Sequence, residues 1–171
     1  MPPGGLPTGT TTEFRKGVTM QDMFRMASQY PAELTEPMRQ ELVAIGVKDL
    51  RTPEEVDAIL GRKQGTVLVV VNSVCGCAAG NARPGVAMAL RHAVVPDEAV
   101  TVFAGVDRDA VARARSYFEG YAPSSPQIAL LRDGKAVFML ERMNIEGRTA
   151  DLVSADLVAA FDRFCGAGAA S

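Results

Sequence analysis

The stretch of residues 66–80 constrains the fold more than any other part of the chain. Its first six residues form an unbroken apolar and β-branched run, which is typical of a strand covered on both faces of a sheet. The run is followed by Cys75-Gly76-Cys77 and then by small residues that suit the start of a helix. At such a junction, unpaired backbone N–H groups and the positive end of the helix dipole favour a thiolate over a thiol. The stretch therefore predicts a redox-active cysteine pair at the end of a central strand.

Composition narrows the class of protein. The chain has 171 residues, a formal net charge of −2 and scattered rather than clustered Lys and Arg, so neither nucleic acid nor a membrane surface is an expected partner. No apolar segment approaches the ~20 residues needed to cross a bilayer, and the N-terminus lacks the pattern of a secretory signal. Three cysteines are too few for a disulfide scaffold, and an odd number fits a reducing compartment. We therefore expect a cytoplasmic protein.

Two short tails flank one predicted domain. Residues 1–18 are rich in Pro, Gly and Thr, and residues 167–171 are small or polar, so both segments are expected to be flexible. Residues 19–166 are expected to form a single domain. It starts with two helices, one from Thr19 and the next over residues 34–46.

The order of elements after residue 46 predicts the fold. The predicted strands are residues 47–50, 66–71, 99–105, 128–131 and 136–140, and the predicted helices are residues 53–60, 78–92, 107–120 and 150–164. Crossover helices place neighbouring strands parallel, whereas the Asp133-Gly134 turn adds an antiparallel edge. We therefore expect an α/β protein with a thioredoxin-like three-layer fold: a central mixed sheet, an antiparallel edge hairpin and two extra N-terminal helices.

The cysteines are expected to have different tasks. Cys75 is nearer the strand–helix junction and is predicted to be the attacking thiolate, with a lowered pKa. Cys77 is predicted to resolve the mixed disulfide that forms on Cys75. A disulfide between the two would close a small, strained ring, which favours isomerisation or release of a small thiol over strong reduction. Cys165, at the end of the last predicted helix, is either a half-buried small hydrophobe or an auxiliary resolving thiol.

A metal site is the alternative use of the cysteines. A structural zinc site usually needs four Cys or His ligands. The chain offers Cys75, Cys77, Cys165 and His92, its only histidine, and nothing in their spacing brings them together. We expect no metal ion and no organic cofactor, and we assign His92 no catalytic role.

Several other residues are candidates for binding a substrate. Pro126 follows Ser125 at the start of a strand, where thioredoxin-like domains commonly place a cis-proline beside backbone that pairs with an extended substrate. The alternative for Pro126 is an ordinary trans proline in a turn. Arg83 is a candidate for binding a carboxylate of a small thiol, or else a surface arginine without that role. The remaining candidates lie in the cysteine segment: Asn72, Ser73 and Gly76.

The segment from Asn72 to Gly85 (Asn-Ser-Val-Cys-Gly-Cys-Ala-Ala-Gly-Asn-Ala-Arg-Pro-Gly) resembles the active-site segment of the bacilliredoxin family. These are thioredoxin-like bacterial proteins with a Cys-Gly-Cys motif, also described as disulfide isomerases. The likeness extends from Met20 to Cys165, and its other stretches are residues 102–107, 121–126, 138–142 and 145–148. One departure is Met143-Asn144, which stands where a histidine is expected.

The resemblance implies a reaction. Cys75 would attack the mixed disulfide between a protein cysteine and bacillithiol and take up the small thiol, and Cys77 would then resolve the adduct. Cys165 also matches a family cysteine near the C-terminus. The implied partners are S-thiolated or disulfide-containing client proteins and a low-molecular-weight thiol, which is bacillithiol or a similar molecule.

Two alternative functions stay open, as does the oligomeric state. One alternative is a general protein disulfide isomerase or weak thioredoxin. The other is a metal- or cluster-binding module that uses the cysteines. The sequence is compatible with a monomer and with a homodimer.

Overall fold

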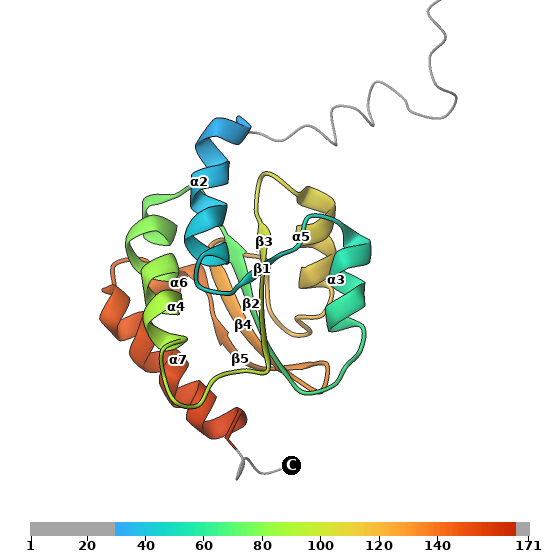
Figure 1. Cartoon of the computed structure of the whole chain (residues 1–171), viewed down its shortest axis with the longest axis vertical. Helices are drawn as coiled ribbons and strands as arrows, with labels where there is room; N and C mark the ends of the chain where they lie inside the picture. The colour runs from blue at the N-terminus through green and yellow to red at the C-terminus, as the bar shows by residue number, and fades with distance from the viewer. Residues whose placement is uncertain (1–29, 167–171) are drawn as a thin grey trace, which may run out of the picture.

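A five-stranded mixed sheet runs through the centre of the protein, a computed structural model in which residues 30–166 are described (Figure 1). The strands are β1 (Lys48–Asp49), β2 (Thr66–Asn72), β3 (Glu98–Phe103), β4 (Gln127–Arg132) and β5 (Lys135–Leu140). Their order is β1-β3-β2-β4-β5, with β2 parallel to β3 and antiparallel to β4. β2 is therefore the central strand, as its unbroken apolar run predicts, and all seven of its residues are buried.

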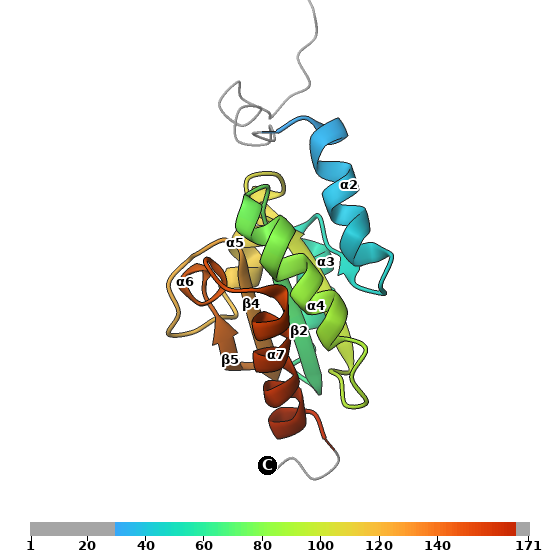
Figure 2. The ribbon, with the colours of Figure 1, turned by 90° about the vertical axis from the view of Figure 1, so that its left-hand side faces the viewer.

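Helices cover both faces of the sheet, as Figures 1 and 2 show. The helices are α3 (Pro53–Leu60) and α5 (Arg108–Arg115) on one face, and α4 (Arg83–Ala89) and α7 (Ala150–Phe164) on the other. Side chains of β2 alternate between the two cores: Leu68 and Val70 pack with α4 and α7, whereas Val69 and Val71 pack with α3 and α5. These three layers confirm the predicted thioredoxin-like fold.

The predicted hairpin and one of the predicted N-terminal helices are present. Asp133 and Gly134 have φ values of 50° and 84°, so both central residues of the β4–β5 turn are left-handed, as a two-residue hairpin turn requires. The helix expected over residues 34–46 is α2 (Ala32–Val43). The helix predicted from Thr19 and both predicted tails lie outside the described residues.

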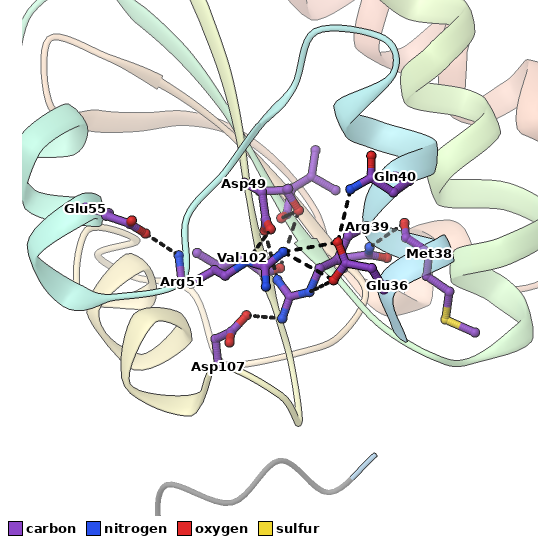
Figure 3. Close-up of polar contacts among 12 residues, drawn as sticks. Glu36, Met38, Arg39, Gln40, Asp49, Arg51, Glu55, Val102 and Asp107 are labelled. Atoms are coloured by element: carbon purple, nitrogen blue, oxygen red, sulfur yellow. Dashed lines mark hydrogen bonds and ion pairs between the residues drawn. The ribbon is translucent and has the colours of Figure 1, made fainter. Parts of the chain in front are cut away.

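A buried arginine fastens α2 to the sheet (Figure 3). Arg39, with 3% of its side chain exposed, donates to Asp49 Oδ1 at 2.9 Å and to Asp107 Oδ2 at 2.5 Å. Its guanidinium carbon also lies 5.1 Å from the centroid of the Phe103 ring. Because Asp49 ends β1 and Asp107 follows β3, these contacts hold α2 at the carboxyl ends of the parallel strands.

Candidate active site

Cys75 lies where β2 gives way to a helix. Its carbonyl oxygen accepts hydrogen bonds from the N–H groups of Ala78 (3.1 Å) and Ala79 (3.2 Å), which belong to the first helical turn. Its own N–H group donates to Ser73 Oγ at 3.3 Å and so fixes the loop between strand and helix. Cys75 is half-buried at this junction.

The surroundings of the two motif cysteines shift their pKa values in opposite directions. Burial raises the pKa of the Cys75 thiol, but hydrogen bonds from the Cys77 thiol, the Ser73 hydroxyl and the Ala78 and Cys77 N–H groups outweigh burial, so the pKa is lowered. The pKa of Cys77 is raised by burial, by the hydrogen bond to Cys75 and by the negative charge on Cys75. The positive charge of Arg142 acts in the opposite direction and lowers it. Of the two thiols, Cys75 therefore loses its proton more readily.

The opposite pKa shifts predict how fast each cysteine reacts with iodoacetamide. The alkylation rate of Cys75 should rise with pH and level off at a lower midpoint than that of Cys165, whose pKa is raised by burial. Cys77→Ala removes one donor to the Cys75 sulfur and should move the Cys75 midpoint to higher pH. Peptide mass spectrometry of protein alkylated between pH 5 and 10 gives the profiles (range chosen to bracket ordinary thiols at ~8.5). A Cys75 midpoint at or above that of Cys165 would contradict the assignment.

The loop that precedes Cys75 is held by a buried arginine. Arg83, which is 3% exposed, donates from Nη1 to the Ser73 carbonyl and to Asn72 Oδ1, each at 3.0 Å. Its Nε donates to Glu41 Oε2 of α2 at 2.6 Å. Asn72 is itself buried and donates from Nδ2 to the carbonyl of Met38, also in α2, at 3.3 Å. α2 thus reaches the cysteine loop through two side chains.

These contacts correct two expectations. Arg83 is not a surface arginine, and its buried guanidinium bonds to protein oxygens instead of facing a substrate carboxylate. Asn72 is 1% exposed, so its side chain acts as part of the scaffold rather than as a substrate contact. Ser73 is also mostly buried, yet its hydroxyl contacts the Cys75 sulfur.

Gly76 is required neither by the backbone nor by packing. A Cβ atom added there would meet nothing within 4 Å, and the residue is exposed without a left-handed φ. Glycine at this position keeps the surface between the two cysteines open.

The helix after the cysteines begins with a π-helical turn, so the helix predicted over residues 78–92 is not regular throughout. The turn η1 (Ala78–Ala82) leads into α4, and the Arg83 N–H group donates to the carbonyl of Ala78, five residues earlier. The cause is Pro84, which has no N–H group and whose ring would clash with the carbonyl four residues before it in a regular α-helix. The first turn is therefore set apart from α4.

The loop before β4 lies on the cysteine side of the sheet. The Ser125–Pro126 peptide bond is cis, as predicted for this position. Gln127, the next residue, is opposite Val71 in the β2–β4 register, so Pro126 lies beyond it in the direction of the cysteines.

A short helix, α6 (Arg142–Ile145), connects two segments near the motif. One is the loop around Ser125 and Pro126 (the proline loop), and the other is the helix that follows the cysteines, η1 with α4 (the cysteine helix). The Arg142 N–H group donates to Ser124 Oγ at 3.2 Å, and the Arg142 guanidinium donates to the Ser125 carbonyl at 3.5 Å. At the other end of α6, Asn81 Nδ2 of the π-helical turn donates to the Ile145 carbonyl at 3.0 Å. No apolar periodicity predicts this helix. A local signal does exist, because Glu141 and Asn144 form a capping box.

Cys165 lies at the opposite end of the sheet from the motif. Its thiol contacts the Thr66 hydroxyl, at the start of β2, whereas Cys75 follows the end of that strand. The length of β2 separates the two thiols by roughly 20 Å. Cys165 packs against the core on the α4 and α7 face. Of the three cysteines, the structure thus brings together Cys75 and Cys77 but not Cys165.

The metal-binding alternative gains no support from the described residues. His92 bonds to Asp162 of α7 at 2.8 Å and follows the end of α4 that is farther from the cysteine motif. Within residues 30–166, no three His, Cys, Asp or Glu side chains converge so that they could hold a metal ion.

Known proteins resemble this chain in sequence and in fold. Residues 30–165 match the family described as disulphide isomerase. A bacilliredoxin of Koribacter versatilis is 53% identical over 82% of this chain and 97% of its own length, and one of Salinibacter ruber is 54% identical over 80% and 82%. A solved oxidoreductase with a thioredoxin fold superimposes with a TM-score of 0.51 at 15% identity, over 66% of this chain and 93% of that one, and supports the fold alone. On the family match and these relatives, the chain belongs to the bacilliredoxin family of thiol oxidoreductases.

Proposed function

We propose that this protein removes a low-molecular-weight thiol, bacillithiol or a similar molecule, from mixed disulfides on client proteins. The observation that carries the proposal is that the pKa of Cys75 is lowered whereas that of its neighbour Cys77 is raised. A thiolate at Cys75 can start an exchange, and a protonated Cys77 within hydrogen-bonding reach of its sulfur can finish it.

The reaction consists of two exchanges. The Cys75 thiolate attacks the small-thiol sulfur of the mixed disulfide, the S–S bond breaks, and the client cysteine leaves as a thiolate that takes up a proton. Cys77 then loses its proton and attacks the Cys75 sulfur, which expels the small thiol as a thiolate and leaves a Cys75–Cys77 disulfide. A dithiol reductant supplies the two electrons that return this disulfide to the reduced pair.

Two open features beside the thiols suit a bound substrate. Gly76 has no side chain that would keep a substrate backbone from the motif. The backbone of Ser125 and Pro126 is the candidate for pairing with an extended client segment.

We place the reaction in the cytoplasm, where a reducing pool can regenerate the pair. None of the helices in residues 30–166 is long and apolar enough to span a membrane.

The Cys77→Ala variant tests the order of events. Reduced variant is mixed with a single-cysteine protein that carries a small thiol as a disulfide-linked cap. Without Cys77 the second exchange cannot occur, so we expect the cap to accumulate on Cys75 in about equimolar amount. Intact-protein and peptide mass spectrometry measure the adduct, and Cys165→Ala is the matched control, in which the cap should not accumulate.

Each competing function predicts a different product in this experiment. A general disulfide isomerase would carry the client protein, rather than the cap, on Cys75. A metal-binding module would carry stoichiometric zinc or iron after anaerobic purification and would lose it on Cys77→Ser. Either result would contradict the proposal.

A further inference from the structure

Arg142 places an exposed positive charge beside the motif. Its side chain is 47% exposed, and its charge acts on both Cys77 and Cys75. Its Nε donates to Glu146 Oε2 at 3.2 Å and its Nη1 to the Ser125 carbonyl at 3.5 Å. Among the described residues, no hydrogen bond engages its Nη2 group. A solvent-facing edge of the guanidinium is therefore available beside the Ser125–Pro126 loop, on the cysteine side of the sheet.

The position of Arg142 is fixed by its helix. α6 is bonded to Ser124 at its start and to Asn81 at its end, so the base of the Arg142 side chain is held between the proline loop and the cysteine helix. Arg83, the other arginine near the motif, is buried, and its Nε and Nη1 groups donate to oxygens of Glu41, Asn72 and Ser73. Of these two arginines, Arg142 is the one whose side chain is exposed to a ligand in solution.

We propose that Arg142 binds an anionic group of the small thiol, so that the protein prefers mixed disulfides whose low-molecular-weight half carries a carboxylate. This inference rests on the function proposed above. Once Cys75 has taken up the small thiol, the thiol is attached at the end of β2, the same end of the sheet as the Ser125–Pro126 loop that Arg142 contacts. A guanidinium can offer two parallel donors to a carboxylate, which makes arginine well suited to this contact.

The test compares three caps of similar size on the same single-cysteine protein. They are 3-mercaptopropionate, which is anionic, 2-mercaptoethanol, which is neutral, and cysteamine, which is cationic. The three caps differ in intrinsic reactivity, so the measured quantity is the change between variants in the ratio of kcat/KM for the anionic cap to that for the cationic cap. Arg142→Gln should lower this ratio about fivefold or more, as expected for one exposed charge-assisted contact.

Two further variants separate binding from a general effect on the thiols. Loss of Arg142 also changes the electric field at both cysteines. That change would slow the release of all three caps alike but leave the ratio of kcat/KM between the anionic and the cationic cap unchanged. Glu146→Gln removes the carboxylate that competes for Arg142 and should raise the ratio. Arg62→Gln is the matched control, because Arg62 is also exposed (53%) and paired with a glutamate, Glu98, but follows α3 at the other end of the sheet.

The possible outcomes distinguish this inference from the function on which it rests. An unchanged ratio in Arg142→Gln, or an equal fall in Arg62→Gln, overturns the binding role of Arg142 while leaving cap removal intact. If the wild-type protein releases none of the three caps, the proposed function itself is overturned and this inference falls with it. A fall confined to Arg142→Gln, together with a rise in Glu146→Gln, establishes the contact.

Discussion

Replacing Cys75 by serine is expected to slow the release of a small-thiol cap by about 10³-fold or more, because an alcohol does not ionise near neutral pH and is a poor nucleophile towards a disulfide. The hydroxyl should keep the junction folded, since it is close in size to the thiol. Release can be followed by the appearance of free client thiol, with dithiothreitol present to recycle the enzyme and a reaction without enzyme as the blank.

Cys165→Ser is the matched control for Cys75→Ser. The same chemical change is made at a thiol whose pKa is raised by burial and which contacts Thr66 at the far end of β2. We expect the rate of cap release to change by less than about twofold, because no step of the proposed reaction involves this sulfur. A loss in Cys165→Ser comparable with that in Cys75→Ser would show that the two-cysteine mechanism is wrong.

The strand–helix junction could be predicted from the sequence because its determinants are local. A run of β-branched residues specifies a buried strand, and the small residues after the motif specify a turn of helix. The start of α3 is local in the same way: Thr52 Oγ1 accepts from the Glu55 N–H group at 3.2 Å, and the Glu55 carboxylate accepts from the Thr52 N–H group at 3.2 Å. Such signals need no knowledge of distant residues.

The support of the junction could not be predicted, because its partners are distant in the chain. Arg83 bonds to Glu41 and to Asn72, which are 42 and 11 residues away. Helical periodicity indicates which residues share a face, but not that an arginine on the buried face will find three oxygen acceptors there. The sequence therefore suggests a surface or ligand-binding role for Arg83, and the structure assigns it to the scaffold.

α6 was missed for a different reason. Four residues make about one helical turn, which is too short for an apolar repeat to appear. Its functional interest comes from the tertiary contacts of Arg142 with Ser124 and Ser125, which only the folded chain reveals.

The largest loss of stability is expected from Arg39→Met. Methionine can fill the space of the arginine stem, but Asp49 and Asp107, whose side chains are 11% and 15% exposed, would be left facing each other without their shared cation. Removing one partner of a buried ion pair costs about 3 kcal/mol or more. Urea unfolding at pH 7, followed by far-UV circular dichroism, measures the change in the free energy of unfolding.

Arg51→Met is the matched control in the same cluster of charges. Arg51 bonds to Asp49 at 2.8 Å and to Glu36 at 3.3 Å (Figure 3). In contrast to Arg39, 49% of its side chain is exposed. An ion pair in contact with water contributes about 1 kcal/mol or less. Equal losses in the two variants would contradict the view that the buried arginine, rather than the whole charge network, holds α2 in place.

The loss in free energy of unfolding caused by Arg39→Met should depend on pH in a defined direction. Burial raises the pKa of Asp107 even in the intact protein, against the opposing effect of Arg39, so loss of the arginine should raise it further. A carboxyl whose pKa is higher in the folded than in the unfolded state destabilises the fold when ionised, and the penalty disappears as pH falls through the folded-state pKa. The difference between Arg39→Met and the wild type should therefore shrink from pH 7 towards pH 4 (a range set by the ordinary carboxyl pKa of about 4). A deficit that stays constant over this range would mean that lost packing against Phe103, not charge, accounts for the effect.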